Sequence, residues 1–328
     1  MSPTLIAFIA IALAFDFLNG FHDSANIVAT MISSRAMSPR RAMLLSATAH
    51  FIGPFLFGVA VATTIGHEVV QPHASTIPVV MAALLAAITW NLITWLLGIP
   101  SSSSHALVGG LVGATIVGHG LDAVQLPGLV KIITALLISP LAGLVGGYAL
   151  MKLVLFLARG ASPRINWFFK RSQTITALAL GLSHGANDAQ KTMGIITMGL
   201  VASGALTQFQ VPLWVIAASA SAISLGTGVG GWRIIRTLGG KFYKIRPVHS
   251  FTAQITSGAV ILGAALLGGP VSTTQVVSSA ILGIGSAERL SKVRWGVAGS
   301  IVTAWLLTIP ASGLLAALAY IVVRHLIA

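Results

Sequence analysis

The stretch GFHDSAN, residues 20–26, places a carboxylate inside a largely apolar part of the chain. The sequence is apolar from Leu5 to Leu13 and again from Ile27 to Ile32, and a basic segment begins only at Arg35. A carboxylate at such a depth in a lipid bilayer is costly, so an acid at this position indicates a functional site. Asp23, the acid of this stretch, is therefore the first candidate functional residue.

A second copy of this stretch, GANDAQK, occupies residues 185–191. When the two copies are aligned, Gly20 matches Gly185, Asp23 matches Asp188, and Asn26 matches Lys191. Two intramembrane acids at corresponding places in the two halves of a chain are typical of an internally duplicated transporter.

The composition predicts an all-α polytopic membrane protein. Of the 328 residues, 55% are hydrophobic and 8% are charged, whereas soluble proteins carry about 25% charged residues. The net charge of +13 comes from short basic clusters between apolar stretches, which is the pattern of cytoplasmic membrane loops and argues against nucleic-acid binding. The chain has no cysteine, so disulfides and thiol ligands are excluded.

Apolar stretches predict the membrane spans and two shorter helices. The spans are expected at about 4–33, 42–65, 77–97, 129–158, 173–202, 211–230, 250–268 and 295–323. Shorter apolar pieces at about 101–118 and 271–285 predict half-helices or re-entrant segments. Gly20 and Gly185 precede the two acids, so we expect the helices to open there. Gly109 and Gly113 form a small-residue pair suited to close helix packing.

The basic loops predict two repeats of opposite orientation. The first loop of the first half is basic, but its counterpart in the second half carries no charge, and the next loops of the second half are basic instead. If basic loops face the cytoplasm, the two halves must be inverted. We therefore expect a first repeat at 1–158, a basic linker at 159–171, a second repeat at 172–328, and both termini outside the cytoplasm.

The two copies of the acidic motif supply candidate ligands for a coupling ion. Carboxylate and amide oxygens can hold sodium, and a carboxylate or an imidazole can instead carry a proton. Asp16 has no acid at the matching place, so it is either a proton site or a structural partner. The candidate coupling-ion residues are Asp16, His22, Asp23, Asn26, Asn187 and Asp188, of which Asp23, Asn26, Asn187 and Asp188 would hold sodium.

Two hydroxyl clusters supply candidate donors for an anion. Pro100 and Pro270 each precede a Ser/Thr cluster that opens a short apolar helix. The free backbone N–H groups and the dipole at such a helix start attract anions. Lys191 either binds the anion or neutralises Asp188. The candidate anion-binding residues are Ser102, Ser103, Ser104, Ser272, Thr273, Thr274 and Lys191.

Four ordered motifs, at 19–23, 100–105, 183–191 and 270–274, resemble those of the inorganic phosphate transporter (PiT) family, and the resemblance covers nearly the whole chain. It implies a bacterial low-affinity phosphate permease in the inner membrane that imports phosphate with protons or sodium by alternating access. It also implies a homodimer, no enzymatic activity and no cofactor. Gln275 departs from the histidine that the family often has, and the large hydrophilic central loop of some relatives is absent.

Several alternatives stay open at the level of the sequence. The substrate is either phosphate, free or as a metal complex, or another oxyanion such as sulfate. An intramembrane aspartyl protease using Asp23 and Asp188 would have the required acid pair, but it leaves both hydroxyl clusters unexplained. We favour protons over sodium as the coupling ion, because His22 and Lys191 each stand where the other copy of the motif has an asparagine.

Overall fold

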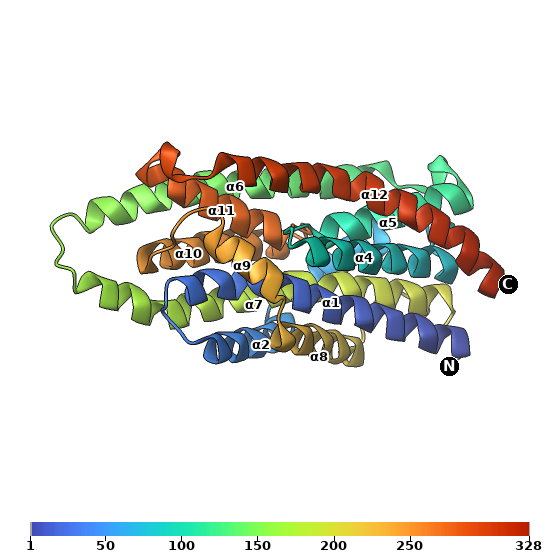
Figure 1. Ribbon diagram of the computed structural model, residues 1–328. Coiled ribbons are helices and arrows are strands. Elements are labelled where there is room, and N and C mark those ends of the chain that lie inside the picture. Colours follow the sequence, from blue (N-terminus) through green and yellow to red (C-terminus); the bar gives the residue numbers. More distant parts are fainter. Residues whose placement is uncertain (1, 328) are drawn as a thin grey trace.

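The structure is a computed structural model that describes residues 2–327 (Figure 1). Within these residues the chain forms twelve α-helices. The first half contains α1 (Pro3–Ser33), α2 (Pro39–Leu56), α3 (Ala60–His67), α4 (Ile77–Leu97), α5 (Ser103–His119) and α6 (Leu126–Leu157). The second half contains α7 (Ile165–Ala202), α8 (Leu213–Val229), α9 (Trp232–Gly240), α10 (Pro247–Leu266), α11 (Thr273–Glu288) and α12 (Trp295–Ile327). Short 3-10 turns lie at Pro72–Ala74, Leu121–Ala123 and Leu290–Lys292.

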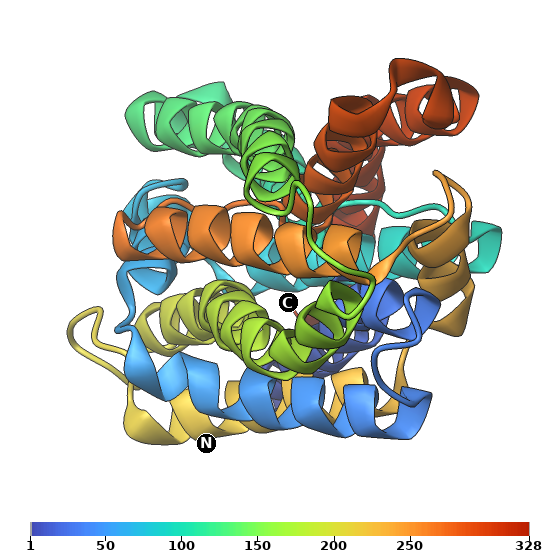
Figure 2. The ribbon, with the colours of Figure 1, turned by 90° about the vertical axis from the view of Figure 1, so that its left-hand side faces the viewer.

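Both halves contain the same succession of long, bent and short helices, and they pack into each other. α1 packs on α8 and α7 on α2, while α5 packs on α12 and α11 on α6. α6 and α12 lie on one side of the bundle and α2 with α8 on the other, with α1, α7 and α10 between them (Figure 2). The two chain ends lie at one end of the bundle, and the connection between α6 and α7 lies at the opposite end (Figure 1).

The helices confirm the all-α membrane fold that the composition predicts. Four helices, α1, α4, α6 and α12, are each long and apolar enough to cross a membrane. Two bent helix pairs, α2 with α3 and α8 with α9, give two further spans if each pair counts as one. The outward faces of α6 and α12 are apolar: Leu141 is 61% exposed, Leu306 71% and Leu314 70%. Apolar side chains on this scale suit contact with lipid.

The openings expected at Gly20 and Gly185 are wrong, because α1 and α7 run through both glycines without a break. The glycines instead allow neighbouring helices to approach closely. A Cβ at Gly20 would lie 2.1 Å from the carbonyl oxygen of Ile223 on α8, and one at Gly185 would lie 2.7 Å from the Cα of His50 on α2. Close packing therefore explains these glycines, and the acids sit on continuous helices.

The true bends lie in the next helices of each half. α2 and α3 meet at 78°, and α8 and α9 meet at 69°. Gly58 and Gly230 have positive φ angles of 75° at these bends, a conformation that glycine adopts without strain. From the sequence we expected an unbroken span at 42–65, which the bend between α2 and α3 contradicts. We also expected the segment that begins at Arg233 to be a basic loop. That second interpretation is wrong, because α9 is an amphipathic helix that buries Ile234 and Leu238.

The start of α7 also differs from the prediction. The helix begins at Ile165, so it includes Lys170 and Arg171, which were expected to lie in a loop before a span starting near 173. Both basic residues are exposed on this first part of the helix. The basic cluster therefore ends on a helix, and the irregular part of the linker is shorter than predicted.

The small-residue pair on α5 makes the close contact that the sequence predicts. A Cβ at Gly109 would lie 2.4 Å from the hydroxyl of Ser312, and one at Gly113 would lie 2.2 Å from the carbonyl oxygen of Gly313, both on α12. Without side chains at these positions, the two helix backbones can touch. This packing fixes the position of α5, one of the two short helices, against α12.

Replacement of Gly113 by alanine is expected to destabilise the protein by about 1–3 kcal/mol, because the new methyl group forces α5 and α12 apart. Gly299→Ala on α12 is the matched control, since a Cβ there meets nothing within 4 Å. That control should stabilise the helix by about 0.5–1 kcal/mol, because alanine restricts the unfolded chain. Thermal unfolding in detergent measures both variants, and equal midpoints for the two would contradict the packing described above.

Candidate functional site

The two short helices, α5 and α11, begin next to each other. Ser104 at the start of α5 donates a hydrogen bond of 2.9 Å to the carbonyl oxygen of Val271, which lies just before α11. Gln275 Nε2 lies 3.2 Å from His105 Nδ1, which joins the first turns of the two helices. Each helix follows a short non-helical segment that contains a proline, Pro100 or Pro270, two residues before the N-cap. Two helix N-termini, with their free N–H groups, are therefore brought together in the interior.

Ser102 and Ser272 are the N-caps of these helices. The Ser102 hydroxyl oxygen accepts from the backbone N–H of His105 at 3.2 Å, and the Ser272 hydroxyl oxygen accepts from the N–H of Gln275 at 3.3 Å. Each hydroxyl therefore has a structural role, but its own proton is not used in the cap. Ser103, the first residue of α5, is buried with them.

Asp23 on α1 reaches the start of α11. Its Oδ1 lies 2.7 Å from His22 Nδ1 and accepts from the Thr274 hydroxyl at 3.0 Å. Its Oδ2 accepts from the Thr273 hydroxyl at 3.2 Å. The side chain is 2% exposed, so these neighbours replace the water that an ionised carboxylate otherwise needs.

Asp188 on α7 meets the same threonine from the other side. Its Oδ2 lies 3.2 Å from the Thr273 hydroxyl and 3.2 Å from His184 Nδ1. Its Oδ1 accepts from the ammonium of Lys191, which also donates to the carbonyl oxygen of Val271 at 3.2 Å. One hydroxyl proton can be given to only one carboxylate at a time, so Thr273 links the two acids of the repeated motif.

Three side chains of this cluster are placed so that they could hold a cation. Ligand atoms of Asp23, His184 and Asp188 all lie within 4.8 Å of one another, and all three residues are buried. His184 lies one residue before the second copy of the motif and was not among the coupling-ion residues predicted from the sequence. Two carboxylates with a neighbouring hydroxyl suit a hard cation, and a proton shared between them suits the same geometry.

The two asparagines of the motifs lie beside the cluster. Asn26 donates to the Thr274 hydroxyl at 3.0 Å, and Asn187 donates to the carbonyl oxygen of Gly269 at 3.3 Å. In each case the amide oxygen is buried and has no hydrogen-bond partner among the described residues. An unpaired amide oxygen in the interior is available to a ligand, and it is costly if none arrives.

Asp16 does not take part in this network of direct contacts. It is fully buried on α1, two turns before Asp23, and neither carboxylate oxygen has a hydrogen-bond partner within residues 2–327. The side chain of Asn19 between them is also buried without a partner in that range. The polar face of α1 therefore extends from Asn26 past Asp23 toward the end of the bundle where the chain begins.

Other polar residues of the site were not singled out from the sequence. His50 is buried, its ring stacks on that of His184 at 4.8 Å between centroids, and its Nδ1 lies 2.7 Å from the hydroxyl of Thr227. Thr94 lies 2.7 Å from the Ser101 hydroxyl. The Gln190 side chain accepts from the backbone N–H of Val61 at 2.8 Å. The sequence signal that could have identified them is a polar residue within an otherwise apolar span.

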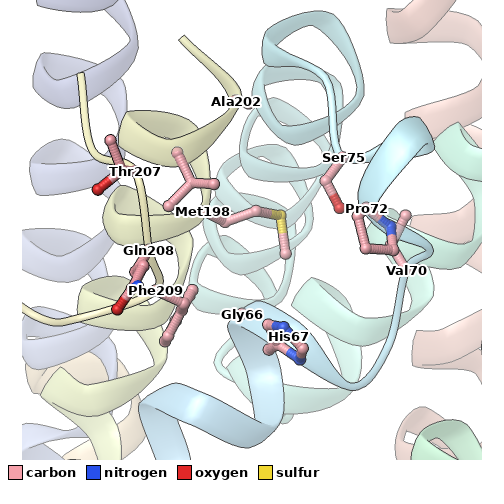
Figure 3. A pocket seen from close by; sticks show the side chains of 11 residues that line it. Gly66, His67, Val70, Pro72, Ser75, Met198, Ala202, Thr207, Gln208 and Phe209 are labelled. Carbon is pink, nitrogen blue, oxygen red and sulfur yellow. The ribbon is translucent and has the colours of Figure 1, made fainter. Parts of the chain in front are cut away.

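A separate cavity of about 580 Å³ (Figure 3) lies near the end of the bundle that holds the chain ends, where α7 finishes (Figure 1). The end of α3, the segment 70–75 after it, the last turns of α7 and the loop that follows α7 line it, with Gly66, Met198 and Phe209 among the lining residues. A Cβ at Gly66 would lie 2.4 Å from the Phe209 ring, so the ring packs directly on the backbone there. None of the acids or hydroxyls described above lines this cavity.

A helical membrane protein in which two half-helix starts and two buried acids meet at one polar centre has the architecture of a secondary transporter. The chain belongs to the Phosphate transporter family, whose profile matches residues 19–316. It is therefore not an enzyme, and the intramembrane protease interpretation is set aside. The resemblance to phosphate transporters drawn from the four motifs is confirmed.

Two bacterial relatives are each described as a probable low-affinity inorganic phosphate transporter. The one from Bacillus subtilis (strain 168) is 46% identical over 97% of both chains. The one from Rhizobium meliloti (strain 1021) is 47% identical over 97% of this chain and 96% of its own. A solved structure titled "The sodium-dependent phosphate transporter" superposes with a TM-score of 0.89 at 26% identity, and it covers 99% of this chain and 100% of its own.

Proposed function

We propose that this protein imports inorganic phosphate by alternating access, with a cation as the coupling partner. One observation carries the proposal: the hydroxyls at the start of α11 donate to both acids of the repeated motif, at the place where two helix N-termini attract an anion. Donors for the anion and ligands for the cation are thus held in one cluster. The names of the relatives support phosphate as the anion.

Sharing of the threonine hydroxyls provides a physical basis for coupling. The Thr273 hydroxyl lies within donor distance of both Asp23 and Asp188, and the Thr274 hydroxyl donates to Asp23, so in this arrangement neither hydroxyl is free for phosphate. Two ionised carboxylates beside an incoming phosphate would also repel it strongly in this water-poor interior. A proton or sodium ion bound to the acids removes the repulsion and frees the hydroxyls. Phosphate is therefore expected to bind tightly only after the cation has bound.

The site residues divide into two groups in this proposal. The phosphate is held by Ser102, Ser103, Ser104, Ser272, Thr273 and Thr274, with Lys191 at the boundary of the two groups, because its ammonium also donates to Asp188. The coupling ion is held by Asp16, His22, Asp23, Asn26, Asn187 and Asp188, with Asp23, Asn26, Asn187 and Asp188 as ligands where the ion is sodium. The unpaired amide oxygens of Asn26 and Asn187 support this second group.

Phosphate is preferred over sulfate because the site contains acids. Near neutral pH phosphate carries a proton that it can donate to a carboxylate, whereas sulfate has none to donate. The test is uptake of labelled phosphate into proteoliposomes, with unlabelled sulfate as competitor and with or without divalent metal. Phosphate uptake that a tenfold excess of sulfate leaves unchanged is the expected result, and equal competition by sulfate would overturn the assignment. Uptake that needs divalent metal would identify a metal–phosphate complex as the substrate.

The two halves are proposed to be inverted repeats, at 1–158 and 172–328, joined by a basic linker at 159–171. Matching successions of helices support this division, and so does the placement of both chain ends at the end of the bundle away from the linker (Figure 1). Basic loops indicate that the linker end faces the cytoplasm, so both termini lie outside. The protein is placed in the cell inner membrane, and it is proposed to be a homodimer.

Single cysteines test this orientation directly, because the chain has none of its own. Cysteine at Ser38, Ile165 or Gly240 should react with a membrane-impermeant maleimide only from the cytoplasmic side. The matched control is a cysteine at Leu121, in the loop at the other end of the bundle, which should react only from outside. Labelling of positions 38 and 240 from opposite sides would contradict the inverted-repeat proposal.

A further inference from the structure

We infer that the Lys191 ammonium is a tethered cation that occupies the ion position of the second repeat. The inference rests on the proposed function, because it specifies how the ion half of the site works. It follows that this carrier takes up one mobile cation fewer per cycle than a carrier with a neutral residue at position 191.

The contacts of Lys191 are those of a bound ion. Its side chain is 1% exposed, and its ammonium donates to Asp188 Oδ1 and, at 3.2 Å, to the carbonyl oxygen of Val271. A carboxylate oxygen and a backbone carbonyl oxygen are the kinds of ligand that a hard cation takes from a protein. The Val271 carbonyl also accepts from Ser104, so it lies between the two half-helix starts.

The first repeat has no such charge. Asn26 stands where the second copy has Lys191, and it donates to the hydroxyl of Thr274. Asp23, the counterpart of Asp188, is contacted by His22 and by two threonine hydroxyls. The permanent positive charge therefore lies on the side of Asp188, and the position beside Asp23 is left for an ion from solution.

The charges in the interior are consistent with this assignment. The buried part of the described chain contains three acids, Asp16, Asp23 and Asp188. It contains only one lysine or arginine, Lys191. Removal of that ammonium would leave Asp188 in the interior with only His184 as a potential cationic partner. A buried carboxylate that loses its partner is strongly destabilised, so it must take up a cation or a proton from solution.

The experiment replaces Lys191 by asparagine, the residue of the first copy, and by glutamine as a second variant. Thermal unfolding of the purified proteins is compared in sodium chloride and in choline chloride at the same pH. The thermal unfolding midpoint should be higher in sodium chloride than in choline chloride, and for K191N or K191Q this difference should exceed that of wild type by about 3 °C. The midpoint of Lys191→Arg, which keeps a cation, should gain no more from sodium than that of wild type. Lys152→Asn, which removes an exposed lysine on α6, is the matched control and should show the wild-type response to sodium.

Uptake measurements provide the second readout. In proteoliposomes at constant pH, phosphate uptake by K191N should be stimulated by sodium several-fold more than uptake by wild type. A folded K191N or K191Q protein whose stability and uptake gain no more from sodium, and no more from a lower pH, than those of wild type would overturn the inference. Failure of the proposed function looks different: wild type would then transport no phosphate under any gradient, whereas sodium-dependent stabilisation does not depend on transport.

Discussion

Replacement of Asp23 by asparagine is expected to lower phosphate accumulation by about 100-fold or more. The variant keeps the size of the side chain but removes the charge that accepts from Thr273 and Thr274 and faces His22. Loss of one partner from a buried polar network typically costs about 3–5 kcal/mol, which corresponds to that range of effect. Accumulation of labelled phosphate in proteoliposomes under an imposed ion gradient measures it.

The control for this prediction is Asp122→Asn. Asp122 lies exposed in the short turn between α5 and α6, so its replacement removes an acid without touching the polar centre. Asp122→Asn should transport as wild type does. A folded Asp23→Asn protein that still accumulates phosphate at the wild-type level would remove Asp23 from the coupling site.

The double replacement Ser103→Ala with Thr273→Ala should weaken phosphate binding by about 100-fold or more. Each substitution removes one hydroxyl from the start of a half-helix, and a hydrogen bond to a charged group contributes about 1.5–3 kcal/mol. Thr273 is expected to have the larger effect, because its hydroxyl also reaches Asp23 and Asp188. Binding of labelled phosphate to the purified protein, at saturating cation, gives the dissociation constant.

Thr303→Ala is the matched control for the hydroxyl variants. Thr303 lies on the exposed face of α12, and its hydroxyl donates to the carbonyl oxygen of Gly299 in the same helix. Its loss should leave phosphate binding unchanged. An unchanged dissociation constant in the Ser103→Ala, Thr273→Ala protein would refute the placement of phosphate at the two helix starts.

Hydropathy and helix-start signals were sufficient to predict most of the architecture. The predicted span 77–97 matches α4, and the short pieces after Pro100 and Pro270 match α5 and α11 closely. These predictions worked because a membrane segment must satisfy its own backbone hydrogen bonds, so an apolar run of the right length forms a helix. Proline followed by Ser/Thr marks a helix start with little ambiguity.

The positions of the bends could not be predicted in the same way. A glycine in an apolar run is compatible with a local break in the helix and with close packing of a second helix. Which of these occurs depends on which helix lies opposite the glycine. Gly20 and Gly185 proved to be contact positions against α8 and α2, whereas Gly58 and Gly230 are at the bends. The choice is made by tertiary packing, about which the local sequence carries no information.

The repeated motif singled out candidate acids and hydroxyls, but it did not predict how they meet. Symmetry would give each acid its own half-helix, yet Asp23 and Asp188 both contact Thr273 at the start of α11. That arrangement depends on how α1 and α7 cross α11, which no spacing along the chain reveals. The stacking of His50 on His184 was missed for the same reason, since α2 and α7 are far apart in sequence.

The most direct test of the account is phosphate accumulation in proteoliposomes with the two ion gradients imposed separately. We favour protons, so an outside-acid pH gradient in sodium-free medium should drive labelled phosphate inward. The same vesicles with a sodium gradient at constant pH provide the comparison. Accumulation under the pH gradient alone is the predicted result. Background uptake under the pH gradient, with accumulation appearing only when sodium is added, would contradict proton coupling, and background uptake under both would contradict cation-coupled phosphate transport.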